Sequence, residues 1–274
     1  MVMGTDSVAE LAKQIRAHTL RMVHKANASH IGSCLSVADI LAVLYDRVLC
    51  VDPTRPDWPN RDRFILSKGH SAAAFYAVLA ERGFFPIELL DTYCQDGSKL
   101  AGHVTHYGVP GIEVSTGSLG HGLPIGCGMA LSGKRNGSSY RVFTLLSDGE
   151  CDEGSTWEAV LFASHHHLNN LIAIIDYNKI QGFGTVREVL DLEPLVSKWV
   201  AFRWAVREID GHNYKQIEDA LTKIPFETGK PSVLIAHTVK GKGVSFMENQ
   251  LAWHYKSPSA EQLAQALSEL GLIK

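Results

Sequence analysis

The chain has 274 residues, of which 45% are apolar, and its formal net charge is −3. This length suits one large domain, 1–274, with a proper core, and the mixing of acidic and basic residues leaves no basic face for nucleic acid. No apolar run approaches the roughly 20 residues that a membrane span needs, and the first six residues carry no signal pattern.

The number and spacing of the cysteines indicate the redox state of the compartment in which the protein works. The five cysteines are widely spaced and form no C-x-x-C pair. This pattern predicts a reducing cytoplasm and argues against a disulfide framework or a structural zinc site. We interpret Cys151 as a small passive residue.

The first third of the chain is predicted to be mainly helical. Apolar residues recur at helical spacing over residues 7–27. We expect a helix over 36–49, a short buried strand over 64–66 and a helix over 72–80. A loop rich in glycine and histidine follows over 97–122.

The rest of the chain alternates strands and helices. The predicted elements, in chain order, are a helix over 122–133, a strand over 140–146, a helix over 155–166, strands over 171–176, 204–209 and 232–236, and a helix over 259–270. This alternation predicts an α/β fold in which a parallel sheet carries helices on both faces.

Two polar side chains follow neighbouring predicted strands. Asp148 comes after the first, and Asn178 comes 30 residues later, after the second. The carboxyl ends of parallel strands meet at one edge of a sheet, where open α/β folds bind ligands. A carboxylate, an amide and a nearby backbone carbonyl suit Mg²⁺ or Ca²⁺ held by a diphosphate. Two ordinary strand-end turns remain the alternative, since Asp-Gly is also a common turn pair.

Five more loops carry unusual chemistry, and most of them follow strands or open helices. Four histidines, His30, His70, His103 and His254, lie in or just beyond these loops. The loops span residues 29–32, 67–70, 101–103, 115–122 and 237–243.

With these motifs in this order, the chain resembles the N-terminal, thiamine diphosphate-binding domain of transketolase over nearly its whole length. It is most similar to split transketolases, in which this domain is a separate subunit. The resemblance implies thiamine diphosphate and Mg²⁺ (or Ca²⁺) as cofactors. It also implies transfer of a two-carbon ketol unit from a ketose phosphate to an aldose phosphate.

The resemblance carries roles onto particular residues. It implies metal ligation by Asp148, Asn178 and the backbone carbonyl of Ile180, and a contact between subunits at Glu153. It implies catalytic roles for His30, His103 and His254. The residues that it assigns to cofactor binding are His70, Gly117, Ser118, Leu119, Gly149, Glu150, Asn178 and His254.

The chain departs from the family pattern at several positions, mostly near the substrate mouth. These departures leave the acceptor sugar open rather than the cofactor. They are Ser147 for glycine, Ile31 for proline, Ser118 for proline, His121 for glutamine, Gly182 for an apolar residue and Tyr255 for glycine.

Other polar residues are ambiguous in sequence. Lys240 and Lys242, flanked by glycines, either touch phosphate or belong to a solvated flexible loop. Five more histidines are interpreted as surface or hydrogen-bonded structural residues: His18, His24, His106, His212 and His237.

The resemblance also predicts a partner. In the family, an activating glutamate comes from a pyrimidine-binding domain, and no segment here supplies it. We therefore expect a C-terminal transketolase subunit, in an α₂β₂ assembly. Two alternatives stay open: the α subunit of a 2-oxoacid dehydrogenase or another split thiamine diphosphate enzyme, and a non-catalytic scaffold that binds the cofactor. The four histidines favour a polyhydroxylated ketose.

Overall fold

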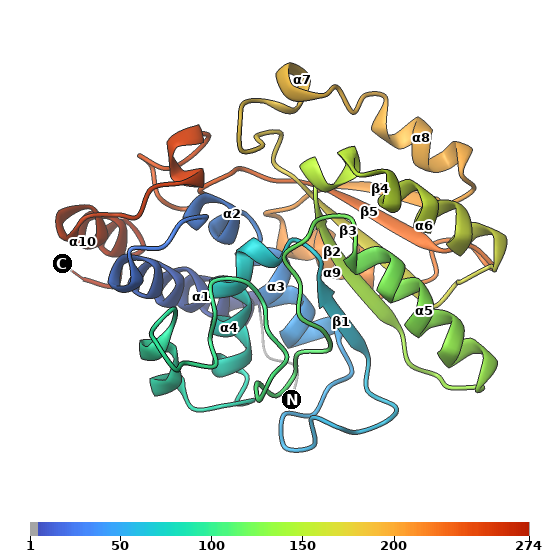
Figure 1. Cartoon of the computed structure of the whole chain (residues 1–274), viewed down its shortest axis with the longest axis horizontal. Helices are drawn as coiled ribbons and strands as arrows, with labels where there is room; N and C mark the ends of the chain where they lie inside the picture. The colour runs from blue at the N-terminus through green and yellow to red at the C-terminus, as the bar shows by residue number, and fades with distance from the viewer. Residues whose placement is uncertain (1–4, 274) are drawn as a thin grey trace.

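A five-stranded parallel sheet forms the centre of the computed structural model, which describes residues 5–273 (Figure 1). The strand order is β1-β2-β3-β5-β4, and every neighbouring pair is parallel. The strands are β1 (Arg63–Leu66), β2 (Val142–Ser147), β3 (Leu171–Tyr177), β4 (Ala205–Asp210) and β5 (Ser232–His237).

Helices cover both faces of the sheet. They are α1 (Thr5–Ala26), α2 (Ile31–Ser36), α3 (Ala38–Val43), α4 (Ala72–Glu81), α5 (Gly122–Arg135), α6 (Gly154–His165), α7 (Val186–Val189), α8 (Leu195–Ala201), α9 (Tyr214–Leu221) and α10 (Ala260–Glu269). A π-helical segment at Leu44–Val48 continues α3. Short 3₁₀ turns lie at Gly69–Ser71, Ile87–Thr92, Gly149–Asp152 and Leu251–His254.

The core consists of two apolar layers separated by the sheet. Successive residues of a strand point to opposite faces, so Ile172 and Ile174 of β3 join one layer, whereas Ala173 and Ile175 join the other. The first layer is shared with α1, α3, α4 and α9, and the second with α5, α6 and α8. Both faces of β2 and β3 are therefore buried, as their continuous apolar sequences predict.

The structure confirms the predicted fold class, and the predicted strands match the observed ones to within two residues. The helix expected over 36–49 begins two residues later and changes to π geometry at Leu44. Four short helices, α2, α7, α8 and α9, were not expected. No helix within residues 5–273 is both long and apolar enough to span a bilayer.

Candidate functional site

A cavity of about 470 Å³ opens at the carboxyl edge of the sheet. Segments that follow β1, β2, β3 and β5 all contribute to its wall. Loops after neighbouring parallel strands converge at this edge, which is why open α/β sheets bind ligands there. The sequence-predicted residues that line the cavity are His30, His70, His103, Gly117, Leu119, Asp148, Gly149, Glu153, Asn178, Ile180 and His254.

Asp148 and Asn178 lie in adjacent turns at the ends of β2 and β3. One oxygen of Asp148 accepts a hydrogen bond from the Gly149 amide at 2.8 Å, and the other accepts one from the Lys179 amide at 2.6 Å. The Asn178 amide oxygen accepts the Ile180 N–H at 3.1 Å. Both side chains are almost fully buried. Backbone donors thus hold a carboxylate and an amide oxygen at the cavity wall.

Electrostatics mark Asp148 as a residue suited to a cation. Burial, and then the nearby Asp176 carboxylate, raise the pKa of Asp148 to about 6. Lys68 cannot relieve this penalty fully, because its ammonium lies 2.5 Å from Asp176. A divalent cation beside Asp148 would stabilise its ionised form.

The protein alone supplies few metal ligands. Within residues 5–273, no group of three or more His, Cys, Asp and Glu side chains could hold a metal ion. An ion at Asp148 and Asn178 would therefore need oxygens from a second ligand. That requirement suits a hard cation bridging to a diphosphate.

Four histidine rings gather on one side of the cavity. The centroid of the His30 ring lies 5.0 Å from that of His254, 5.2 Å from that of His70 and 5.7 Å from that of His103. His30 adopts a left-handed backbone conformation with φ 71°, which is uncommon for a non-glycine residue and places it at the start of α2.

Three of these rings, those of His30, His70 and His254, are kept neutral. Burial, and then nearby cationic and histidine groups, lower the pKa of His30 to about 4 and that of His254 to about 3. Burial also holds the pKa of His70 well below its ordinary range. Nδ1 of His254 lies 3.0 Å from the Lys240 ammonium, which can only donate, so the ring hydrogen of His254 is on Nε2. At neutral pH these histidines can exchange protons without carrying a permanent charge.

Comparison with known proteins decides the family. Residues 7–273 match the family model described as "Transketolase, thiamine diphosphate binding domain". This chain belongs to the transketolase family. It is 45% identical to a 6-deoxy-6-sulfo-D-fructose transketolase subunit of Clostridium sp. (strain MSTE9), over 94% of each chain. It is 42% identical to an apulose-4-phosphate transketolase subunit of Phocaeicola vulgatus, over 98% of this chain and 95% of that one.

Solved transketolases share the fold of this chain. The match to the Campylobacter jejuni enzyme has a TM-score of 0.92 at 31% identity and covers 99% of this chain but 44% of that one. The match to the Leishmania mexicana enzyme has a TM-score of 0.91 at 30% identity and covers 97% and 42%. This transketolase chain therefore spans less than half the length of those solved chains.

Two residues that the resemblance assigns to the cofactor lie outside the cavity wall. Glu150 is fully buried, and its carboxylate accepts hydrogen bonds from the Ser67 hydroxyl and from the Gly120 amide, the latter at 2.9 Å. Its place is behind the wall, where it ties the loop before α5 to the end of β1. Ser118 is exposed and does not line the cavity, although both of its neighbours do.

Lys240 belongs to the site, and the alternative of a solvated loop is wrong for this residue. Its side chain is 1% exposed and lines the cavity. The ammonium donates to the carbonyl oxygens of Ile180 at 2.8 Å and Gln181 at 3.2 Å. Its position just after a buried strand was the available sequence signal. Ser33 also lines the cavity, but its sequence offers no comparable signal.

The buried Lys68–Asp176 ion pair was also missed. Both side chains are 0% exposed. Asp176 further accepts hydrogen bonds from the Ser36 hydroxyl at 2.6 Å and from Asn178 Nδ2 at 3.1 Å. The pair therefore orients Asn178 from below, and Lys68 adds positive charge beneath the cavity floor.

Two departures from the family pattern meet at the cavity mouth. A Cβ atom added at Gly182 would lie 2.9 Å from the Tyr255 hydroxyl and 3.3 Å from Nε2 of His254. The Tyr255 and His254 rings lie 4.7 Å apart between centroids. Tyr255 therefore occupies space that a larger residue at 182 would need, and the two substitutions form one local arrangement.

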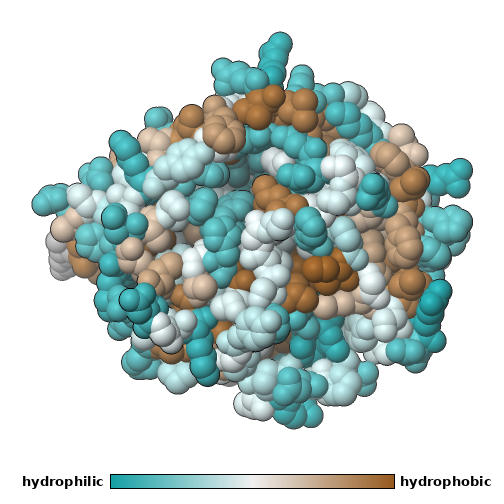
Figure 2. Space-filling view, in the orientation of Figure 1, coloured by the Kyte–Doolittle hydropathy of each residue, from teal (hydrophilic) through white to brown (hydrophobic). Residues whose placement is uncertain are grey.

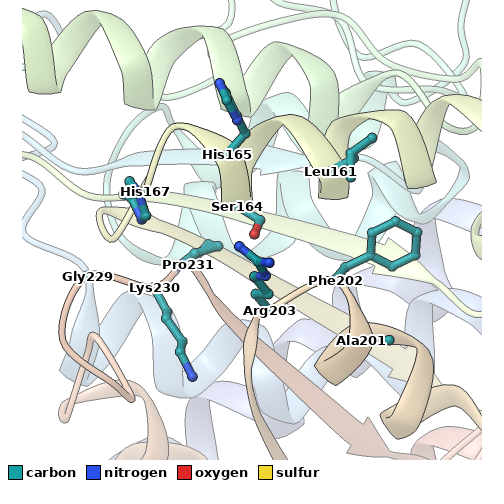
Figure 3. Close-up of a pocket in the computed structure, with 10 residues that line it drawn as sticks. All are labelled: Leu161, Ser164, His165, His167, Ala201, Phe202, Arg203, Gly229, Lys230 and Pro231. Carbon is teal, nitrogen blue, oxygen red and sulfur yellow. The ribbon is translucent and has the colours of Figure 1, made fainter.

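A second cavity, of about 600 Å³, lies at the opposite edge of the sheet (Figure 3). Its wall joins the end of α6 to the segments that precede β4 and β5. His165, His167 and Arg203 on this wall are exposed, and no carboxylate among the described residues lines it. Although larger, this cavity lacks the buried polar groups of the carboxyl edge, so we place the functional site at the smaller one.

Proposed function

We propose that this chain is the cofactor-binding subunit of a split transketolase, which moves a two-carbon ketol unit from a ketose phosphate to an aldose phosphate. The observation that carries the proposal is that Asp148 and Asn178 share one cavity with four histidines. The length of the relatives supports a separate subunit, because the chain covers 94% and 95% of two relatives named as transketolase subunits.

The residues present fit thiamine diphosphate with Mg²⁺ or Ca²⁺. Asp148, Asn178 and the Ile180 carbonyl would hold the metal. That carbonyl has a lone pair left beyond the one used by Lys240. The Gly149 backbone, His70 and Lys240 would face the diphosphate. When bound, thiamine diphosphate supplies the nucleophilic carbon and the electron sink that carbon–carbon bond cleavage requires.

The histidines of this chain would manage protons and hydroxyl groups. A donor carbonyl oxygen develops negative charge as it is attacked, and a neutral imidazole N–H can stabilise that charge. His30 and His254, 5.0 Å apart between centroids, would flank that oxygen. His254, with its hydrogen on Nε2, would donate to the oxygen, and His30 would take the hydroxyl proton of the ketose. His103, on the loop before α5, would hold the terminal hydroxyl of the donor. A ketose needs several such donors, which favours transketolase chemistry over 2-oxoacid decarboxylation.

A second chain completes the proposal. Relatives whose names describe them as subunits of a transketolase support a C-terminal transketolase subunit in the role of partner, and we propose an α₂β₂ assembly. Glu153, at the start of α6, would lie where the two chains meet. Further along the same helix, Leu161 and Phe162 are 60% and 40% exposed. Figure 2 shows apolar side chains on the right of the view, the side on which Figure 1 places α6. Such exposed apolar groups support burial against another chain.

The test is reconstitution of the chain with the C-terminal subunit of a split transketolase. We expect ketol transfer from xylulose 5-phosphate with both chains present, and none with this chain alone. Asp148→Asn should weaken binding of magnesium and thiamine diphosphate by more than about 100-fold. It replaces an anionic oxygen ligand of the metal with a neutral amide, a larger change than loss of an outer-shell partner, which costs roughly 10–100-fold. Calorimetry measures the binding.

Asp96→Asn is the matched control, since Asp96 is an exposed aspartate in a loop outside the cavity wall. It should bind both cofactors as the wild type does. Transfer by the isolated chain at the rate of the pair, or unchanged cofactor binding in Asp148→Asn, would contradict the proposal.

A further inference from the structure

A buried polar cluster lies behind the segment that carries Lys240. We call it the Asp39 cluster, and it consists of Arg16 on α1, Asp39 on α3, His212 in the turn before α9 and Tyr214 at the start of α9. The Asp39 carboxylate accepts bonds from both Arg16 Nη atoms at 2.8 and 2.6 Å, from Tyr214 Oη at 3.1 Å and from His212 Nδ1 at 2.7 Å. Asp39 is 3% and Arg16 6% exposed.

The two ring nitrogens of His212 have fixed roles. The backbone amide of Val239 lies 2.8 Å from Nε2, and an amide N–H can only donate, so Nε2 accepts. The ring hydrogen is then on Nδ1, where it is donated to Asp39. His212 therefore connects a buried carboxylate to the backbone one residue before Lys240.

Arg16 holds the same segment from the other side of Lys240. Its Nε donates to the carbonyl oxygen of Lys242 at 2.9 Å. The Gly241 amide donates to the Gly32 carbonyl at 2.9 Å, and Gly241 has a φ of +82°. Two members of the Asp39 cluster therefore contact the backbone at residues 239 and 242, on either side of the lysine that enters the cavity.

We propose that His212, oriented by Asp39, is a positioning residue that sets the place of Lys240 in the cavity. This inference rests on the proposed function, in which Lys240 faces the diphosphate. His212 does not line the cavity. It acts through the Val239 amide, in the way that outer-shell partners orient the groups that bind a ligand. Sequence alone presents His212 as an ordinary structural histidine.

Two variants of His212 separate hydrogen bonding from packing. His212→Leu removes both the donor and the acceptor. His212→Gln keeps one donor for Asp39 and one acceptor for the Val239 amide, but does not titrate. Tyr214→Phe is the matched control, because it removes only a hydroxyl that donates to the same carboxylate.

The first readout is hydrogen exchange in the full chain without cofactor. Losing one hydrogen bond should make the Val239 amide of His212→Leu exchange about tenfold faster. The amide should stay protected in His212→Gln and in Tyr214→Phe. Nitrogen-15 spectra of wild-type His212 should show the hydrogen on Nδ1. If the amide of His212→Leu stays as protected as in the wild type, the proposal is overturned.

The second readout is calorimetric binding of thiamine diphosphate and magnesium to the two-subunit enzyme. We expect about tenfold weaker binding in His212→Leu, with wild-type affinity in His212→Gln and Tyr214→Phe. Equal losses in His212→Leu and Tyr214→Phe would indicate general destabilisation and overturn the proposal. If the wild type binds no cofactor, the proposed function fails, whereas hydrogen exchange still tests the link between His212 and the segment.

Discussion

At the scale of single residues, the cavity combines a buried cation, Lys240, with uncharged histidines, His30 and His254. Burial, and then the neighbouring Lys68, lower the pKa of Lys240 to about 8, so this lysine still carries its charge at neutral pH. The pKa values of His30 and His254 lie near 4 and 3, so these rings do not. The positive charge of Lys240 therefore lies directly beside a neutral ring, 3.0 Å from Nδ1 of His254, so an anionic group and an uncharged proton donor can be bound side by side.

The Gly182–Tyr255 arrangement predicts an effect on substrate use. In Gly182→Ala the new methyl group would lie 2.9 Å from the Tyr255 hydroxyl, so the ring must move at the cavity mouth. We expect the acceptor KM to rise about fivefold, the low end for overpacking, because Tyr255 is 56% exposed and can adjust. Steady-state kinetics of the two-subunit enzyme measure this.

Tyr255→Phe supplies the control, because it removes the colliding oxygen. The double variant Gly182→Ala, Tyr255→Phe should recover most of the wild-type KM. An unchanged KM in Gly182→Ala would show that the mouth does not constrain the acceptor.

Sequence reasoning reached the residues whose position follows from a single strand. Asp148 and Asn178 come directly after apolar runs, so their meeting at one edge was predictable from local pattern. The Lys68–Asp176 pair was not, because its two members are 108 residues apart and nothing local signals their contact. The inward orientation of Glu150 could not be predicted from the sequence, since Asp148 and Gly149, which precede it in the same motif, line the cavity.

At the scale of elements, the parallel strands were predictable and the short helices were not. Both faces of β2 and β3 are buried, which leaves an unbroken apolar signal in the sequence. Helices such as α7, with four residues, and α8, with seven, are too short to be stable alone and depend on tertiary contacts. Propensity summed over so few residues carries little information.

The final helix, α10, begins with a capping box whose contribution to stability can be measured. The Ser259 hydroxyl accepts the Gln262 amide at 3.2 Å, and the Gln262 side chain accepts the Ser259 amide at 2.9 Å. The helix buries Ala266 and Leu267 and packs against α1. We expect Ser259→Ala to lower the free energy of unfolding by about 1 kcal/mol, because it leaves amide donors of the first turn without this partner. Urea denaturation measures the loss.

Ser268→Ala is the control for this helix. Ser268 lies on the same helix but is exposed and near its end, away from the cap. It should change the free energy of unfolding by no more than about 0.5 kcal/mol. Equal losses in the two variants would show that the capping box adds nothing to stability.

At the scale of the whole molecule, the two apolar layers on the faces of the sheet differ from its carboxyl edge, where the candidate site lies. The two apolar layers supply the stability. The carboxyl edge instead buries ionisable groups, including Asp148, Glu150, Asp176, Lys68 and Lys240. Burying charge is unfavourable unless it is paired. Burial of the apolar layers therefore offsets the unfavourable burial of ionisable groups at the carboxyl edge. Those groups are arranged to bind a ligand and not to stabilise the fold.

This difference predicts that Asp148 destabilises the metal-free protein as pH rises. Its pKa is about 6 in the folded chain and 3.8 ordinarily, so the folded state binds a proton more tightly than the unfolded state does. The resulting stabilisation is fully present below the ordinary pKa and disappears as pH rises through about 6.

Asp148→Asn removes this titration. In EDTA, we expect the free energy of unfolding of the variant, minus that of the wild type, to be about 2 kcal/mol larger at about pH 7.5 than at about pH 4.5. Urea denaturation at several pH values measures the difference, and Asp96→Asn, which alters an exposed carboxylate, should run parallel to the wild type. If the difference between Asp148→Asn and the wild type did not change with pH, groups within the chain would already compensate for burying the ionised Asp148 carboxylate. The reason for assigning a cation to it would then be lost.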